Sequence, residues 1–179
     1  MMDCKQALVD TNGDMDKAIE LLRKQGLDAA GKRAGRATKA GRIGHYVHPP
    51  GLVGVLLELN CETDFVAKNA EFAALLHDLC MHVAACRPVA VSREHIKPEV
   101  IEREKEIYRA QVQDKPAPVQ DKIVASKLET FFKDNCLVEQ PFVKDPKKTV
   151  ADLIKELIAK LGENVTVRRF VRYAVGEEE

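Results

Sequence analysis

The stretch LVGVLLELNCETDFVAKN, residues 52–69, is the part of the sequence on which the predicted fold depends, because a strand pattern ends in it and a helix pattern begins. Every second residue from Val53 to Leu59 is valine or leucine, as expected for a strand with one buried face. Another strand pattern, IGHYVH, precedes it at residues 43–48, and the intervening PPG is a turn signal. The two patterns predict a β-hairpin with a buried face.

A helix is predicted after residue 69, because apolar residues then recur at helical spacing. This stripe consists of Phe72, Leu75, Leu76, Leu79, Cys80 and Val83. His82 lies at the edge of the stripe, where a side chain can be half buried and still reach a surface partner, although most histidines in such a position are structural. Pro88 is expected to end the helix.

Further helices are predicted in the second half of the chain. Residues 97–135 contain two charged helical patterns, separated by a KPAP break at residues 115–118, and they predict a helical hairpin. Thr149 and Asp152 form a capping-box-like pair before the next helix, and Gly162 is expected to end that helix.

Residues 165–173 return to a strand pattern. Val165, Val167, Val171 and Tyr173 are expected to share one face. Arg169 is the discordant residue on that face, which indicates a bulge or a sheet edge. The predicted fold class is therefore α+β, with a small antiparallel sheet packed against helices.

Two short helices are predicted at the front of the chain, from Met2 to about Thr11 and from Asp14 to about Lys24. Gly26 is the signal that ends the second helix. The following residues are rich in lysine, arginine and glycine, which favours a flexible basic tether over a phosphate-binding patch. The chain therefore divides into a helical segment, residues 1–27, a basic linker, residues 28–42, and a core domain, residues 43–179.

Composition limits the function classes. Lysine plus arginine number 28 and aspartate plus glutamate also number 28, so no overall positive field attracts DNA or an anionic membrane. The sequence has no apolar run long enough to span a bilayer, and its start does not resemble a secretion signal. Its five scattered cysteines are typical of reduced thiols. These features predict a cytoplasmic protein without membrane or direct nucleic-acid partners.

The residues from Cys61 to Phe65 allow several interpretations. Glu62 and Asp64 offer fewer oxygen ligands than a magnesium or calcium site usually needs. Cys61 as a nucleophile requires a histidine base that the sequence cannot place. Asp64 as a helix cap is the structural alternative, and it leaves Phe65 at an exposed helix entrance as a candidate partner anchor. No catalytic residue, metal site or cofactor is predicted.

Several stretches resemble bacterial translation elongation factor Ts, and together they run over essentially the whole chain. The most specific is ELNCETDFVAK at residues 58–68. The others are MMDCKQAL with NGDMDKAIELLRKQG at the front, MHVAA at residues 81–85, QPFVKDPKKTV at residues 140–150 and LGENVTVRRF at residues 161–170.

The resemblance implies a guanine-nucleotide exchange factor that binds elongation factor Tu in its GDP form and promotes GDP release and GTP rebinding. In that family a T-D-F-V segment disturbs the partner's magnesium site, with the phenylalanine wedged between helices of the GTP-binding domain. The matching residues here are Thr63, Asp64, Phe65 and Val66, with His82 assisting at that contact. The other implied contacts are Leu161 and Gly162 near the phosphate loop, Val143 and Lys144 on another partner domain, and Met1 and Met2 on the GTP-binding domain.

The resemblance also bears on domains and assembly. Family members usually begin with a further helix and an L-R-x-x-T-G-x-G segment, so residues 1–27 match an incomplete ubiquitin-associated-like domain without its first helix. The single-copy core is similar to short members of the family, which implies a homodimer. Two rival hypotheses are RNA binding through the basic residues between Lys32 and Arg42, and an enzyme that uses Cys61.

Overall fold

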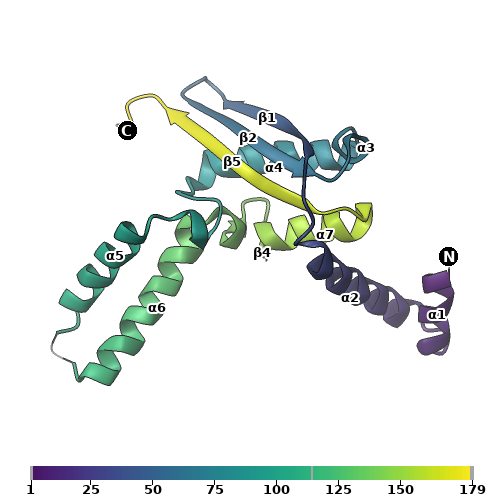
Figure 1. Ribbon diagram of the computed structural model, residues 1–179, viewed down its shortest axis with the longest axis horizontal. Coiled ribbons are helices and arrows are strands. Elements are labelled where there is room, and N and C mark those ends of the chain that lie inside the picture. The colour runs from purple at the N-terminus through teal and green to yellow at the C-terminus, as the bar shows by residue number, and fades with distance from the viewer. Residues whose placement is uncertain (1, 114, 178–179) are drawn as a thin grey trace.

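A three-stranded antiparallel sheet forms the centre of the protein, whose computed structural model describes residues 2–113 and 115–177. Strands β1 (Ala40–His48) and β2 (Val53–Cys61) form the predicted hairpin, and β5 (Val165–Ala174) pairs with the other side of β2. Figure 1 shows the three strands side by side in the upper part of the molecule. With helices packed on a small antiparallel sheet, the fold is α+β, as predicted.

One face of the sheet is covered by helices α4 (Ala70–Cys86) and α7 (Val150–Leu161). The alternating side chains of β2 supply the centre of the core, as the sequence pattern predicts, and Leu59 and Cys61 are completely buried. From α4 the core receives Phe72, Leu76, Leu79, Cys80 and Val83. Helix α7 begins at the predicted capping box, where Thr149 and Asp152 bond each other's backbone N–H groups.

A bulge in the last strand changes which of its residues face the core. The register of β5 against β2 shifts between Glu58 and Leu59. Before the shift Val165 and Val167 are buried, whereas Val171 and Tyr173 beyond it are exposed. The predicted bulge is confirmed, but the prediction that Val171 and Tyr173 share the buried face is wrong, because one extra residue reverses the alternation.

Helices α5 (Pro98–Ala110) and α6 (Ala117–Asn135) lie side by side as a hairpin that projects from the core (Figure 1). A small apolar cluster of Ala90, Ile96, Phe132 and Cys136 lies at its base. Arg93 joins the hairpin to the core, because its guanidinium bonds Glu129 of α6 at 2.7 Å and Glu139 at 2.6 Å. These carboxylates raise the pKa of Arg93 above its ordinary value, so its guanidinium stays charged at any ordinary pH.

The N-terminal helices are α1 (Met2–Asp10) and α2 (Met15–Arg33). The prediction that Gly26 ends the second helix is wrong, because α2 continues for two more turns and packs along α7. A Cβ atom at position 26 would lie 3.2 Å from the Cβ of Ala159, so this glycine permits close helix packing. The predicted linker over residues 28–42 is correspondingly too long, since only residues 34–39 connect α2 to β1.

The remaining elements are short. Helix α3 (Asp64–Ala67) follows β2, and strands β3 (Pro141–Phe142) and β4 (Asp145–Thr149) form a separate two-stranded sheet before α7. The 3-10 helices η1 (Arg93–His95) and η2 (Leu137–Glu139) flank the base of the α5–α6 hairpin. Among the residues described, no helix has the length and apolar character required to cross a membrane.

Candidate partner-binding site

Phe65 is the most exposed large hydrophobic residue in the described part of the chain, with 81% of its surface accessible. It lies in α3, a single turn whose other apolar residues face inward: Ala67 is buried and Val66 packs against the core. An aromatic ring held in water beside an intact core is a candidate anchor for a partner. The predicted exposure of Phe65 is confirmed.

Thr63, and not Asp64, is the N-cap of α3. Its backbone is extended, and its hydroxyl oxygen accepts a hydrogen bond from the N–H of Val66 at 3.5 Å. Asp64 is instead the first residue of the helix, where its carboxylate bonds Lys68 at 2.7 Å. The hydrogen bond from Lys68 lowers the pKa of Asp64, so the group next to Phe65 is a carboxylate at neutral pH.

The end of α7 contacts this loop directly. Gly162 ends α7 with a positive φ of 78°, a conformation that glycine adopts without strain. The next residue, Glu163, accepts hydrogen bonds from the backbone N–H of Thr63 at 2.9 Å and from its hydroxyl at 2.6 Å. The fold therefore brings the Thr63–Val66 segment together with the Leu161–Gly162 turn, two regions that the family resemblance singled out.

His82 does not reach the surface. It is completely buried, which favours the structural alternative over a half-buried side chain with access to a partner. Its Nε2 bonds the side-chain oxygen of Gln140 at 2.9 Å, and its Nδ1 accepts a bond from the N–H of Val143 at 3.2 Å. Burial lowers the pKa of His82 and outweighs the opposing effect of Gln140, so the ring is neutral at neutral pH.

Val143 and Lys144 form the turn between β3 and β4 that His82 supports from below. Val143 is partly exposed, and Lys144 bonds Asp78 of α4 at 2.8 Å. The structure thus joins these two predicted contact residues to His82 through one hydrogen bond, at the other end of α4 from Phe65.

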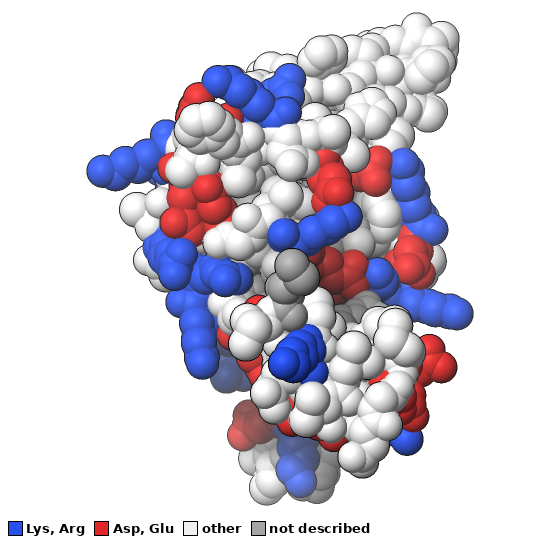
Figure 2. Space-filling model, turned by 90° about the vertical axis from the view of Figure 1, so that its right-hand side faces the viewer, with Lys and Arg blue, Asp and Glu red and all other residues white. Residues whose placement is uncertain are grey.

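A continuous surface made by α4 and α7 connects the two ends. Next to the Phe65 loop, Glu71 of α4 bonds Lys160 of α7 at 2.7 Å. A groove of about 250 Å³ follows between the two helices. Its lining residues are Leu75, Asp78, Phe142, Leu153, Glu156, Leu157 and Lys160. Figure 2 shows acidic and basic side chains interspersed on the side of the molecule that it displays, without one dominant charge.

The N-terminal residues lie apart from this surface. Met2 is exposed on α1, which packs against α2 at the lower right of the view in Figure 1. Met1, also a predicted contact, lies outside the described residues. The sequence prediction therefore names two separate regions, of which only one contains Phe65.

Cys61 is not placed to act as the nucleophile that the sequence analysis considered. Cys61 is completely buried, and its thiol donates to the carbonyl of Thr63 at 3.1 Å. Burial and the nearby charge of Glu163 raise the pKa of this thiol, which keeps it protonated. Within residues 2–113 and 115–177, no group of three or more histidine, cysteine or acidic side chains is arranged to hold a metal ion.

Glu163 is the residue at this site that the sequence patterns miss. It lies in the stretch LGENV, but nothing in local spacing shows that its carboxylate bonds a residue a hundred positions earlier. The only local signal is a charged residue placed directly after a helix-ending glycine.

Comparisons with known proteins give one consistent result. Residues 15–177 match the family model described as Elongation factor TS. The chain is 58% identical to the elongation factor Ts of Moorella thermoacetica over 179 residues, which cover 99% of this chain and 88% of that protein. It is 57% identical to the elongation factor Ts of Thermotoga maritima over 177 residues, covering 99% of this chain and 89% of that protein.

Proposed function

Because this chain belongs to the elongation factor Ts family and is therefore a translation elongation factor, we propose that it releases GDP from elongation factor Tu by inserting Phe65 into that partner. The proposed complex forms with the GDP form of elongation factor Tu in the cytoplasm. Phe65 and its neighbours disturb the magnesium and phosphate site there, GDP leaves, and GTP then binds.

The observation that carries this proposal is the exposure of Phe65 on a loop that is held by hydrogen bonds, from Thr63 to Glu163 before the ring and from Lys68 to Asp64 after it. A ring that is 81% accessible in the free protein has most of its apolar surface still to bury. Burying such a side chain contributes about 1.5–3 kcal/mol. Asp64, which stays ionised beside it, adds a negative charge where the partner holds a magnesium ion and phosphates.

Exchange of this kind requires no covalent step. The exchange factor and GDP each bind the partner well, and each weakens the binding of the other by the same factor. Magnesium neutralises the phosphates, so disturbing its site removes part of the charge pairing that holds GDP. A thousandfold faster release needs about 4 kcal/mol of differential binding, which is more than one phenylalanine supplies.

Other residues therefore share the work in this proposal. Leu161 and Gly162, next to the Phe65 loop, face the phosphate-loop side of the partner, and Val143 and Lys144 contact a different partner domain. His82 acts indirectly, because it holds the N–H of Val143 from inside the core. Met2 makes a separate contact from α1.

The test is release of fluorescent GDP from elongation factor Tu with and without this protein. Phe65→Ala is expected to lower the exchange efficiency by about 10- to 150-fold, the equivalent of the lost burial. Val89→Ala, which removes another exposed apolar side chain, is the matched control and should leave exchange unchanged. Wild-type release rates with Phe65→Ala would refute the proposed role of Phe65.

We also propose that the protein is a homodimer joined through the outer sheet face, meaning the face of the sheet turned away from α4 and α7. The strand register places five exposed apolar residues together on this face: Ile43, Val47, Leu56, Val171 and Tyr173. An apolar patch on a sheet suits a second copy of the same sheet, because in a dimer with a twofold axis the same patch of each subunit covers that of the other.

A further inference from the structure

We propose that the turn after α7, residues 162–164, is a positioning element that fixes Phe65 for exchange, with Glu163 as its principal positioning residue. The inference rests on the proposed role of Phe65. It assigns to Glu163 no contact with nucleotide or magnesium; Glu163 acts through Thr63.

Glu163 bonds Thr63 through both of its carboxylate oxygens. One oxygen accepts the backbone N–H of Thr63 and the other accepts its hydroxyl, at 2.9 and 2.6 Å. The same Thr63 hydroxyl oxygen caps α3 by accepting the N–H of Val66. Phe65 lies inside the turn that this cap closes. Glu163 therefore acts on the position of Phe65 through two successive hydrogen bonds, the first to Thr63 and the second from Thr63 to Val66.

A second carboxylate makes the reverse contact. Glu62 accepts the backbone N–H of Asn164 at 2.7 Å, so residues 62–63 and 163–164 each place a carboxylate on a backbone N–H of the other segment. We call these contacts the reciprocal clamp. Hydrogen bonds to ionised acceptors are shorter and stronger than neutral ones, which gives the clamp a defined geometry.

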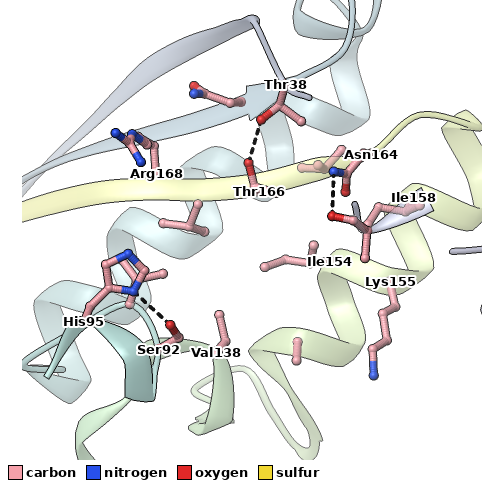
Figure 3. A pocket seen from close by; sticks show the side chains of 16 residues that line it. Thr38, Ser92, His95, Val138, Ile154, Lys155, Ile158, Asn164, Thr166 and Arg168 are labelled. Carbon is pink, nitrogen blue, oxygen red and sulfur yellow. Dashed lines mark hydrogen bonds between the residues drawn. The ribbon is translucent and has the colours of Figure 1, made fainter. Parts of the chain in front are cut away.

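Asn164 extends the clamp to the N-terminal helices. Its side chain is 1% exposed, and its amide donates to the carbonyl oxygens of Ala34 at 3.2 Å and Arg36 at 2.7 Å. Asn164 lies on the wall of a cavity of about 550 Å³. Figure 3 shows its side chain bonded to the backbone carbonyl of Ala34, and nearby the hydroxyl of Thr38 bonded to that of Thr166. The turn therefore holds the exit of α2 as well as the Phe65 loop.

The position of Glu163 favours a role in placement over a role in global stability. The Glu163–Thr63 hydrogen bonds lie at the surface, where such interactions contribute little to the free energy of unfolding. The core itself is built by the sheet, α4 and α7. An ordered loop, in contrast, raises effective affinity directly, because apparent affinity scales with the fraction of molecules in the competent conformation.

The experiment is a double-mutant cycle on GDP release from elongation factor Tu, with Glu163→Ala, Phe65→Ala and the combined variant. We expect Glu163→Ala to lower exchange efficiency about tenfold, as when the competent conformation falls to about one tenth. In the Phe65→Ala background the same substitution should change efficiency less than about twofold, because nothing remains to be positioned. Glu102→Ala, which removes an exposed glutamate that is paired with Lys105 of its own helix, is the control.

Conservative variants separate positioning from loss of folding. Glu163→Gln keeps an oxygen that can accept the N–H of Thr63 and should recover part of the lost activity. Thr63→Val keeps the shape of Thr63 without its hydroxyl and should reproduce the defect, with a circular dichroism spectrum like that of the wild type. Spectra that show unfolding for both Glu163→Ala and Thr63→Val would contradict the inference, since the contact would then be structural.

The outcomes distinguish the two proposals. A wild-type protein that leaves GDP release unchanged refutes the proposed function and the inference with it. A strong defect in Phe65→Ala combined with a normal Glu163→Ala refutes the positioning role alone. Independent, multiplying effects of the two substitutions refute it as well, because Glu163 would then act without Phe65.

Discussion

At the scale of single residues, His82 shows how a buried side chain supports a surface contact. Its two ring nitrogens hold Gln140 and the N–H of Val143, and the second bond links it to the exposed turn between β3 and β4. An imidazole in this position must be neutral, because Nδ1 accepts a hydrogen bond from a backbone N–H and has no place for a second proton.

This arrangement predicts a pH dependence of stability. Burial lowers the pKa of His82 in the folded chain below its ordinary value of 6.5, so below that pH the unfolded chain binds a proton that the folded chain does not. The free energy of unfolding should therefore fall as the pH drops from about 7.5 to about 5.5. Urea unfolding at both pH values should show a smaller fall for His82→Gln.

His77→Gln is the matched control for this measurement, because His77 lies on the same helix and is exposed. It should retain the full fall seen in the wild type. An equal fall in all three proteins would contradict the assignment of the effect to His82.

Residue patterns predict the exposure of Phe65 but not the contacts that fix it. An acid followed by an aromatic residue at the end of a strand is visible in the sequence, as is the capping box of Thr149 and Asp152. The sequence alone does not decide whether Thr63 or Asp64 caps the helix, since both are common N-cap residues. The bonds of Glu163 depend on the tertiary fold, which spacing does not reveal.

At the scale of elements, the packing of α2 against α7 accounts for a prediction that was wrong. A glycine after about three helical turns usually marks a helix end. Here Gly26 lies against Ala159 inside a helix that continues to Arg33. The residues around Gly26 give no sign that α7, more than a hundred residues later in the chain, will pack against this position. The rule that a glycine ends a helix therefore gave the wrong boundary. The bulge in β5 was predictable because Arg169 broke the alternation locally.

A comparison of two glycines in α2 tests this explanation. Gly31→Ala should raise the free energy of unfolding by about 0.5–1 kcal/mol, because a helical alanine has the better propensity and position 31 has open space around it. Gly26→Ala should gain less, since its Cβ would crowd Ala159. Urea unfolding measures both values, and Gly26→Ala made in an Ala159→Gly background should gain as much over that background as Gly31→Ala gains over the wild type. Equal gains at positions 26 and 31 would exclude tight packing at Gly26.

At the scale of the whole molecule, the outer sheet face is the main surface without a partner among the described residues. On the covered face, α4 and α7 bury the alternate residues of β2. On the outer face, Leu56 of β2 pairs with Val171 of β5 and both are accessible. Composition predicted a globular chain and the strand and helix patterns an α+β fold, but the shifted register of β5 was needed to show that Val171 and Tyr173 join the apolar residues of this face.

The proposed dimer predicts a mass change. At micromolar concentration the wild type should sediment as a dimer, and Leu56→Glu should shift it toward the monomer, because a charge would be buried against its own copy across the twofold axis. Analytical ultracentrifugation measures both. Val119→Glu places the same charge at an exposed valine of α6 and should leave the mass unchanged. A monomeric wild type would rule out the dimer.

The reciprocal clamp also has a consequence for the folding of the chain during synthesis. Its two halves are 100 residues apart in the chain, and the second half lies immediately before the last strand of the sheet. While the ribosome is still making this protein, Phe65 has already emerged but its loop has no Glu163 to hold it. The growing chain therefore carries Phe65 on a loop that stays unfixed until residues 162–164 have emerged and folded against it.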